Sequence, residues 1–366
     1  MAYRFKVERI GVIPLRIPFS DGGGAAGLMP QKWTHLDIAL VRVESAEGAV
    51  GWGEAFAYSC MSATVAAVRD MVAPLVVGRE ITDIAALNYE LQHKLHIQGR
   101  YGITIFAIGG VDIALWDLAA KTEGASLAEL LGGRKRDSVP AYASLVRYGE
   151  PALVRKMAVR AAEEGYRDVK LHEIALPAIA AGREAVGSRV RLTTDVNCNC
   201  SRAQAEELLP EMRRLNLFWV EEPVFPLDDA ETLGRLIHRF GVPIASGKNA
   251  CTSVEFSRTI PHITYPQPSV TKVGGVTEFL KVVELAKQAG KAPMPHSPYF
   301  GPGYWATLQL AAARPEVGLF EFLYIAAEQW LTQEVPMPKS GQIAIPAGPG
   351  LDFEPDRAVI EKYRVS

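Results

Sequence analysis

The sequence predicts an α/β protein built on a closed (β/α) barrel, with a smaller α+β region before it. From about residue 139 onward, short apolar runs alternate with amphipathic segments, which is typical of repeated βα units and a parallel sheet. Eight such runs occur, the number of strands that closes a barrel. They lie at 141–146, 168–172, 191–196, 217–222, 242–247, 262–267, 292–296 and 318–322.

The elements before the barrel follow from local patterns. Residues 36–54 form two alternating runs joined at a Glu-Gly turn, which predicts an antiparallel hairpin. Segments 62–77 and 82–97 carry apolar residues at helical spacing, and 104–121 is apolar enough for a buried helix. No helix follows the glycine run at 22–24 to cradle a phosphate, so we expect a mobile lid near 19–35 instead.

We expect the chain to divide into three parts. Residues 1–135 form the α+β domain and residues 136–330 form the barrel. The segment 331–366 is interrupted by Gly and Pro, and we expect it to pack back on the first domain.

The composition indicates a small-molecule partner. The 366 residues are 48% hydrophobic, and a formal net charge of −2 gives no basic excess for nucleic-acid binding. Charged residues interrupt the apolar N-terminus and no apolar stretch reaches membrane length, so we expect a cytosolic protein without a membrane partner. Cys198 and Cys200 form a CxC without the second pair of a structural zinc site, which favours plain thiols.

Polar residues recur near the ends of the predicted strands with the period of a βα unit. Seven of them, 21 to 27 residues apart, would face one mouth of the barrel, where functional groups collect in such proteins. They are Lys170, Asp195, Glu221, Lys248, Ser269, His296 and Glu321.

Several segments resemble the mandelate racemase and muconate lactonizing group of the enolase superfamily. GAVGWGEA, DIALWDLAAK, LLGG, WVEEP, TKVGGVTE and a late PGL match its patterns in family order over nearly the whole chain. The resemblance implies a modified (β/α)7β barrel with a capping domain made from both chain ends. It also implies removal of a proton next to a carboxylate, an enediolate held by Mg²⁺ on three acidic ligands, and a homo-oligomer, either dimer or octamer.

One of the three metal ligands that the resemblance implies is replaced. Asp195 matches the first ligand and Glu221 the second, but Lys248 stands where the third acid belongs. Three carboxylates with a divalent ion and two carboxylates with one ammonium both sum to a charge of −1, so the site balances without metal. We therefore hypothesise that Lys248 occupies the magnesium position, which argues against the Mg²⁺ cofactor.

The acid–base positions also depart from the family pattern. His172 stands where a Lys-x-Lys pair carries its second lysine, and Lys170 is expected to hold a substrate carboxylate. His296 matches the seventh-strand base, but Ser269 replaces the aspartate that orients it, and Glu321 resembles the acid that meets the substrate carboxylate. Further candidates support the acidic centre or, in the capping loops, set specificity. They are Asn197, Glu222 and Lys272, and Trp33, His35 and Tyr58.

The leading hypothesis is a lyase or isomerase acting on a small hydroxy or sugar carboxylic acid. We expect His172 and His296 to act from two sides, with dehydration favoured and racemisation, epimerisation or cycloisomerisation as alternatives. A Schiff base at Lys248 is disfavoured because adjacent carboxylates keep its amine protonated. The changed positions leave an alternative of another class, a non-catalytic relative that binds a carboxylate.

Overall fold

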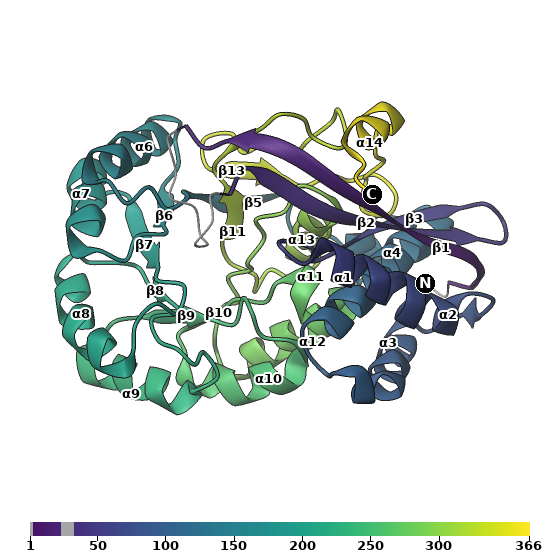
Figure 1. Cartoon of the computed structure of the whole chain (residues 1–366), viewed down its shortest axis with the longest axis horizontal. Coiled ribbons are helices and arrows are strands. Elements are labelled where there is room, and N and C mark those ends of the chain that lie inside the picture. Colours follow the sequence, from purple (N-terminus) through teal and green to yellow (C-terminus); the bar gives the residue numbers. More distant parts are fainter. Residues whose placement is uncertain (1–2, 23–32) are drawn as a thin grey trace.

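The computed structural model consists of an antiparallel sheet and a curled parallel sheet, lying side by side (Figure 1). It describes residues 3–22 and 33–366, so the predicted lid at 19–35 falls mostly outside the described residues. The antiparallel part confirms the predicted hairpin, because β2 (His35–Ser45) pairs with β3 (Val50–Ala55). β1 (Phe5–Ser20) pairs along β2, and two short strands join its ends, β4 (Glu80–Ile81) and β12 (Ala326–Ala327).

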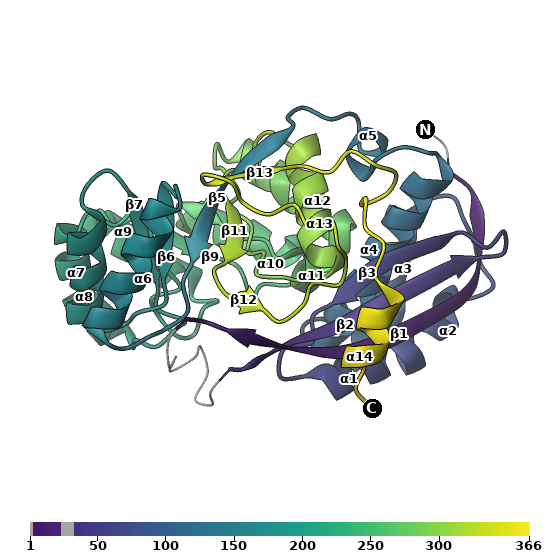
Figure 2. The same cartoon turned by 90° about the horizontal axis from the view of Figure 1, so that it is seen from above.

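The helices of the first third cover one face of the antiparallel sheet (Figure 2). Helix α4 packs directly on β3, because glycines there leave room for it: a Cβ at Gly53 would lie 2.1 Å from the carbonyl oxygen of Gly110. The segments are α1 (Met61–Ala66), a π-helical turn at Ala67–Val72, α2 (Ala73–Val76), α3 (Ile84–Lys94), a 3₁₀ turn at His96–Gln98, and α4 (Ile103–Thr122).

Helix α4 corrects one expectation from the sequence. Among the described residues it is the one helix long and apolar enough to cross a membrane, whereas no stretch of that length was expected. Its most apolar window is 83% buried inside the protein, because α4 is covered by the sheet on one side and by neighbouring helices on others. The apolar composition of α4 is therefore that of a core helix.

The parallel sheet is the barrel. Its strands follow the order β10-β9-β8-β7-β6-β5-β11, and helices α6 to α9 arc around their outer side (Figure 1). The strands are β5 (Ser138–Ser144), β6 (Asp168–Leu171), β7 (Arg191–Asp195), β8 (Val220–Glu221), β9 (Ile244–Ser246), β10 (Tyr265–Pro266) and β11 (Phe320–Leu323). The helices are α6 (Pro151–Glu163), α7 (Leu176–Val186), α8 (Arg202–Arg214), α9 (Ala230–Phe240), α10 (Thr252–Thr259), α11 (Val270–Val273), α12 (Gly275–Gln288) and α13 (Pro302–Ala313).

The run at 292–296, expected to be a strand, does not form one. Pro293 and Pro295 have no backbone N–H, so this segment cannot complete a ladder on either side. It still bridges the gap in the sheet: the Met294 N–H donates to the Pro266 carbonyl at 2.8 Å, and the Gly318 N–H donates to the Pro293 carbonyl at 2.8 Å. His296 is thereby held at the barrel mouth without a regular strand.

The C-terminal residues contact both sheets. β13 (Gln342–Ala344) pairs antiparallel with β5, while α14 (Arg357–Tyr363) lies against β1. The Trp52 indole donates to Glu354 at 3.0 Å, which ties this tail to β3. These contacts agree with a tail that packs back on the first sheet, and the boundaries at 135 and 330 stay a prediction.

Candidate active site at the barrel mouth

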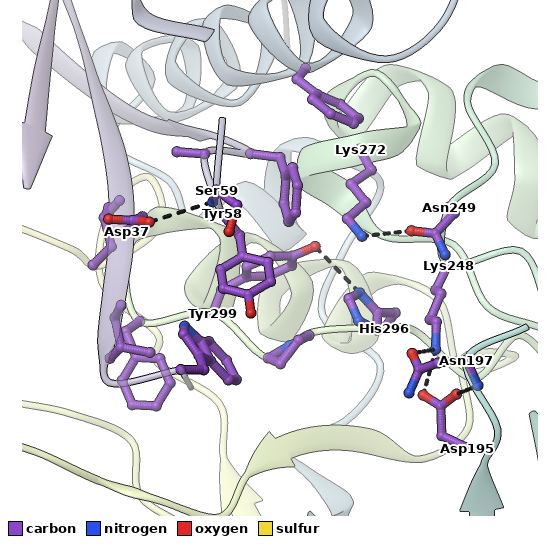
Figure 3. A pocket seen from close by; sticks show the side chains of 18 of the residues that line it. Asp37, Tyr58, Ser59, Asp195, Asn197, Lys248, Asn249, Lys272, His296 and Tyr299 are labelled. Atoms are coloured by element: carbon purple, nitrogen blue, oxygen red, sulfur yellow. Dashed lines mark hydrogen bonds and ion pairs between the residues drawn. The ribbon is translucent and has the colours of Figure 1, made fainter. Parts of the chain in front are cut away.

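A cavity of about 840 Å³ lies between the barrel mouth and the antiparallel sheet. Figure 3 shows its two sides: Asp37 in β2 and Tyr58 and Ser59 in the turn after β3 come from the cap. Asp195, Lys248 and Lys272 come from the barrel. Of the residues predicted from the sequence, the following line this cavity: Trp33, Tyr58, His172, Asp195, Asn197, Lys248, Lys272 and His296.

The Lys248 ammonium lies between the two predicted metal ligands. Its Nζ is 2.5 Å from Asp195 Oδ2 and 3.1 Å from Glu221 Oε1, and it also donates to Asn197 Oδ1 at 2.9 Å. Lys248 is the second residue after β9, and Asp195 and Glu221 end the neighbouring strands β7 and β8. Asn197 is in a left-handed backbone conformation with φ 50°, which asparagine adopts more readily than most non-glycine residues.

A second ammonium group, that of Lys170, pairs with the same two carboxylates. Lys170 Nζ is 2.7 Å from Glu321 Oε1, 3.2 Å from Glu221 Oε1 and 3.5 Å from Asp195 Oδ2. Ser144 Oγ donates to Glu321 at 2.7 Å, and Gln267 donates to Glu221 at 2.7 Å. Lys170 and Glu321 are fully enclosed and do not line the cavity, so Lys170 does not reach a substrate there.

The electrostatics of this cluster keep its ammonium groups charged. Burial works against the charge of Lys248, but Asp195 and Glu221 outweigh it and raise the pKa of Lys248. Burial likewise opposes ionisation of Asp195, yet Lys248 and Lys170 hold its pKa well below the usual range. Burial followed by the Asp195 charge raises the pKa of Glu221 to about 7, whereas in Glu321 burial is outweighed by Lys170, which lowers its pKa to about 2.

His172 occupies the wall beside this cluster. Its Nδ1 lies 2.5 Å from the Leu145 carbonyl and its Nε2 lies 3.3 Å from Asp195 Oδ2, so only a protonated ring donates to both. Burial and the Lys170 ammonium oppose that proton and lower the pKa of His172. At neutral pH the ring is therefore a neutral imidazole whose Nδ1–H is fixed on Leu145.

His296 lies across the cavity with a different set of partners. Its Nδ1 is 3.5 Å from the Tyr299 hydroxyl (Figure 3) and 3.2 Å from Ser269 Oγ. These two hydroxyls also contact each other. Burial, against a weaker opposing effect of Glu321, holds the pKa of His296 well below its usual range. Ser269 orients the ring but supplies no charge to raise its basicity.

The third lysine of the mouth has neutral neighbours. The Lys272 ammonium donates to Asn249 Oδ1 at 2.9 Å and lies 4.2 Å from the centre of the Phe56 ring. Burial, followed by the charge of Lys248, lowers the pKa of Lys272 to about 8. Asn249 in turn donates to Glu222 at 3.1 Å, which places Glu222 behind the cavity wall and beside Lys248.

The capping side of the cavity is mainly aromatic. Trp33 packs against Tyr58 with ring centres 4.8 Å apart and against Phe19 at 4.9 Å. His35 does not line the cavity, because it lies exposed at the start of β2 with its Nδ1 bonded to Thr34. Trp33 and Tyr58 thus remain candidates for specificity, and His35 does not.

Several residues that line the cavity were not predicted from the sequence. Arg147 lies just beyond the first strand of the barrel, so the strand-end rule that found Lys170 and Asp195 also applied to it. Glu54 in β3 was inside a quoted motif and Asn249 is the neighbour of Lys248, but neither received a role. Tyr299 had no local signal, since its contact with His296 depends on how the loop after residue 296 folds.

The donors do not fit the Mg²⁺ that the resemblance implies. Mg²⁺ requires an octahedral set of oxygen ligands, whereas here an ammonium group contacts both remaining carboxylates. Among the described residues there is no group of three or more His, Cys, Asp and Glu side chains placed to hold a metal ion.

A capped (β/α) barrel with acids and bases at its strand ends defines a protein of the enolase fold. Comparison with protein families makes this assignment specific. Residues 32–132 match the N-terminal domain of mandelate racemase / muconate lactonizing enzyme, and residues 152–359 match the enolase C-terminal domain-like family. The chain belongs to the mandelate racemase/muconate lactonizing enzyme family of the enolase superfamily.

Its relatives include dehydratases and a cycloisomerase. It is 31% identical to D-galactarolactone cycloisomerase of Agrobacterium fabrum, over 89% of this chain and 91% of that protein, and 28% identical to arabinonate dehydratase of Saccharolobus solfataricus, over 90% and 91%. An L-talarate dehydratase structure from Polaromonas sp. JS666, complexed with Mg and L-glucarate, superposes with a TM-score of 0.84 at 28% identity, covering 99% of this chain and 98% of that one.

Proposed function

We propose that this protein is a lyase that dehydrates a small hydroxy or sugar carboxylic acid, beginning with removal of the proton next to the carboxylate. The observation that carries the proposal is the presence of His172, His296 and the Lys248 ammonium in the lining of one cavity. The similarity to arabinonate dehydratase supports dehydration as the overall reaction. A cytosolic location and a homo-oligomeric state belong to the same proposal.

In the proposed reaction His296 is the base: its low pKa keeps the ring neutral, and the tautomer whose Nδ1–H donates to Ser269 Oγ has a free lone pair on Nε2. The C–H bond breaks, its electron pair enters an enediolate, and the proton moves to His296. The bond from the next carbon to its hydroxyl then breaks, the imidazolium returns the proton to that hydroxyl, and water leaves. The enol that remains becomes a 2-keto-3-deoxy acid.

Lys248 stabilises the enediolate in this proposal. Its ammonium is buried and its N–H groups are directed at Asp195, Asn197 and Glu221, so it acts on the enediolate through a fixed positive charge in a site of low dielectric constant. No step requires a metal. An ammonium is a weaker electrophile than a divalent ion, so the proposal favours substrates with an acidic α-proton or a good leaving group.

Two other functions have specific support. The 31% identity with D-galactarolactone cycloisomerase favours ring opening of a lactone, which uses the same proton removal with the carboxylate of the lactone ester as leaving group. The substitutions at Lys248, His172 and Ser269 favour a non-catalytic protein that binds a carboxylate in the same cavity.

Exchange of the α-proton in D₂O tests these functions together. Chelator-treated protein is mixed with a panel of acid sugars and their lactones, and NMR follows deuterium uptake and product. We expect deuterium exchange and formation of a keto acid without added Mg²⁺. The exchange rate should fall by about 100-fold or more in His296→Ala and in His172→Ala. His238→Ala, an exposed histidine on α9, is the matched control.

Each other outcome selects an alternative. Exchange coupled to lactone opening selects the cycloisomerase. Binding without exchange selects the non-catalytic protein, and exchange that begins only when Mg²⁺ is added refutes the role of Lys248.

A further inference from the structure

One buried cation in the cavity lining has no anionic partner. Lys272 is 7% exposed, and the contacts of its Nζ are the neutral Asn249 amide and the Phe56 ring. Within residues 3–22 and 33–366, no carboxylate lies within 4.0 Å of it, and Glu222, the acid of this network, is contacted by Lys248 instead. A buried ammonium group is costly unless an anion pairs with it, so this position favours an anion from outside.

A second unpaired cation lies on another wall. Arg147 donates through Nε to the His172 carbonyl at 2.6 Å, but its Nη2 is buried without a hydrogen-bond partner. The side-chain N–H₂ of Asn197 is also buried without a partner, while its oxygen accepts from Lys248. Buried donors are nearly always satisfied in folded proteins, so these two also favour an acceptor supplied by a ligand.

The other charges that line the cavity are already compensated. Asp195 pairs with Lys248 at 2.5 Å, and Asp37 pairs with Arg16 at 2.8 Å. Glu54 accepts from the Gly303 N–H at 2.9 Å, and burial raises its pKa to about 7. The cavity therefore has two uncompensated positive positions, Arg147 and Lys272.

These two positions lie on opposite sides of the barrel mouth. Arg147 follows β5 and is bonded to the residue after β6, whereas Lys272 follows β10 and is bonded to Asn249, which follows β9. In the sheet, β7 and β8 lie between the pair β5–β6 and the pair β9–β10. Asp195, at the end of β7, and the Lys248 ammonium paired with it therefore lie between Arg147 and Lys272.

We propose that the substrate of the reaction proposed above is a dicarboxylate that spans the mouth. One carboxylate, next to the reacting carbon, binds Arg147 and the Asn197 amide, and the second binds Lys272. The inference rests on the proposed function only in assigning the carbon that reacts. The two carboxylate-binding positions do not depend on that function. A cavity of about 840 Å³ accommodates an acid of about six carbons, since ligand sites of this size hold small organic molecules.

Calorimetric titration with matched pairs of acids tests the proposal. The pairs differ in the second carboxylate alone or nearly so: glucarate and gluconate, adipate and hexanoate, glutarate and pentanoate. We expect the dicarboxylate of at least one pair to bind about tenfold or more tightly than its partner, as a charge-assisted hydrogen bond provides. Lys272→Met should remove this preference and Lys272→Arg should retain it, while Arg147→Met should weaken both members of the pair.

Three results would overturn the proposal: equal affinity within every pair, an equal loss for both members in Lys272→Met, or tighter binding of 6-phosphogluconate than of any dicarboxylate, which would indicate a phosphate position. The titration needs no turnover, so its result is separate from that of the exchange experiment. A dicarboxylate preference without α-proton exchange refutes the proposed function alone, and exchange on monocarboxylates without that preference refutes this inference alone.

Discussion

Substituting Lys248 by Asp should convert the site into one that depends on Mg²⁺. In the native protein Lys248 contacts Asp195 at 2.5 Å and Glu221 at 3.1 Å. Unit charges about 4 Å apart attract by about 4 kcal/mol at an effective dielectric constant of about 20, and desolvation offsets part of this. Removing one partner of a buried pair typically lowers the free energy of unfolding by about 3–5 kcal/mol. Lys248→Asp also adds a third negative charge to the cluster. Without metal, its free energy of unfolding should therefore fall by at least about 3–5 kcal/mol.

Excess Mg²⁺ should restore much of this loss, because the variant presents three hard oxygen ligands. At a free concentration of about 100 times Kd, a ligand stabilises the folded state by about 2.7 kcal/mol. Urea unfolding of wild type, Lys248→Asp and Lys248→Met, with and without Mg²⁺, measures both effects. Lys248→Met loses the ammonium without gaining a ligand, so it should be destabilised and indifferent to Mg²⁺. If Mg²⁺ stabilises the wild type as much as Lys248→Asp, Lys248 yields its place to metal and the reasoning is wrong.

Two further predictions concern single groups in the cavity. The pKa of Glu54 is raised from 4.5 to about 7 by burial, so the folded state binds the additional proton and stability falls as pH rises through this range, by about 3 kcal/mol. Urea unfolding at pH 5 and pH 8 measures this change, and Glu54→Gln should remove it. If the stability difference between the two pH values is the same in the variant as in the wild type, the prediction is wrong. Ser269→Asp should place a carboxylate beside His296 Nδ1, now 3.2 Å from the serine oxygen, and raise its pKa. The acidic limb of kcat/KM should then move to higher pH, whereas Ser269→Ala should lower the rate without that upward shift.

The strand-end residues were predictable from the sequence because parallel strands of a barrel all end at the same mouth. Lys170, Asp195 and Glu221 come from neighbouring strands β6, β7 and β8, and the period of one βα unit was enough to bring their side chains into one cluster. The family motifs have another origin: WVEEP lies at the end of β8, but GAVGWGEA and DIALWDLAAK lie in the cap, in β3 and α4.

Individual geometry was not predictable in the same way. The prolines at 293 and 295 read as part of an apolar run, but removal of two backbone donors prevents a strand there. Lys170 and Lys248 have similar sequence contexts, yet one is enclosed by three carboxylates and the other lines the cavity. His35 is near Trp33 in the chain, yet Trp33 lines the cavity and His35 does not, because His35 begins β2 and its ring contacts the Thr34 hydroxyl.

The sequence by itself determined the barrel, the cap and the replacement of an acidic ligand by Lys248, because periodicity and residue identity are local properties of the chain. Only the tertiary structure decided which charges compensate one another. Lys248 and Lys170 are paired with carboxylates from other strands, while Lys272 and Arg147 are not. Pairing depends on distances of a few ångströms between segments far apart in sequence, so it is fixed only when the strands close around the mouth.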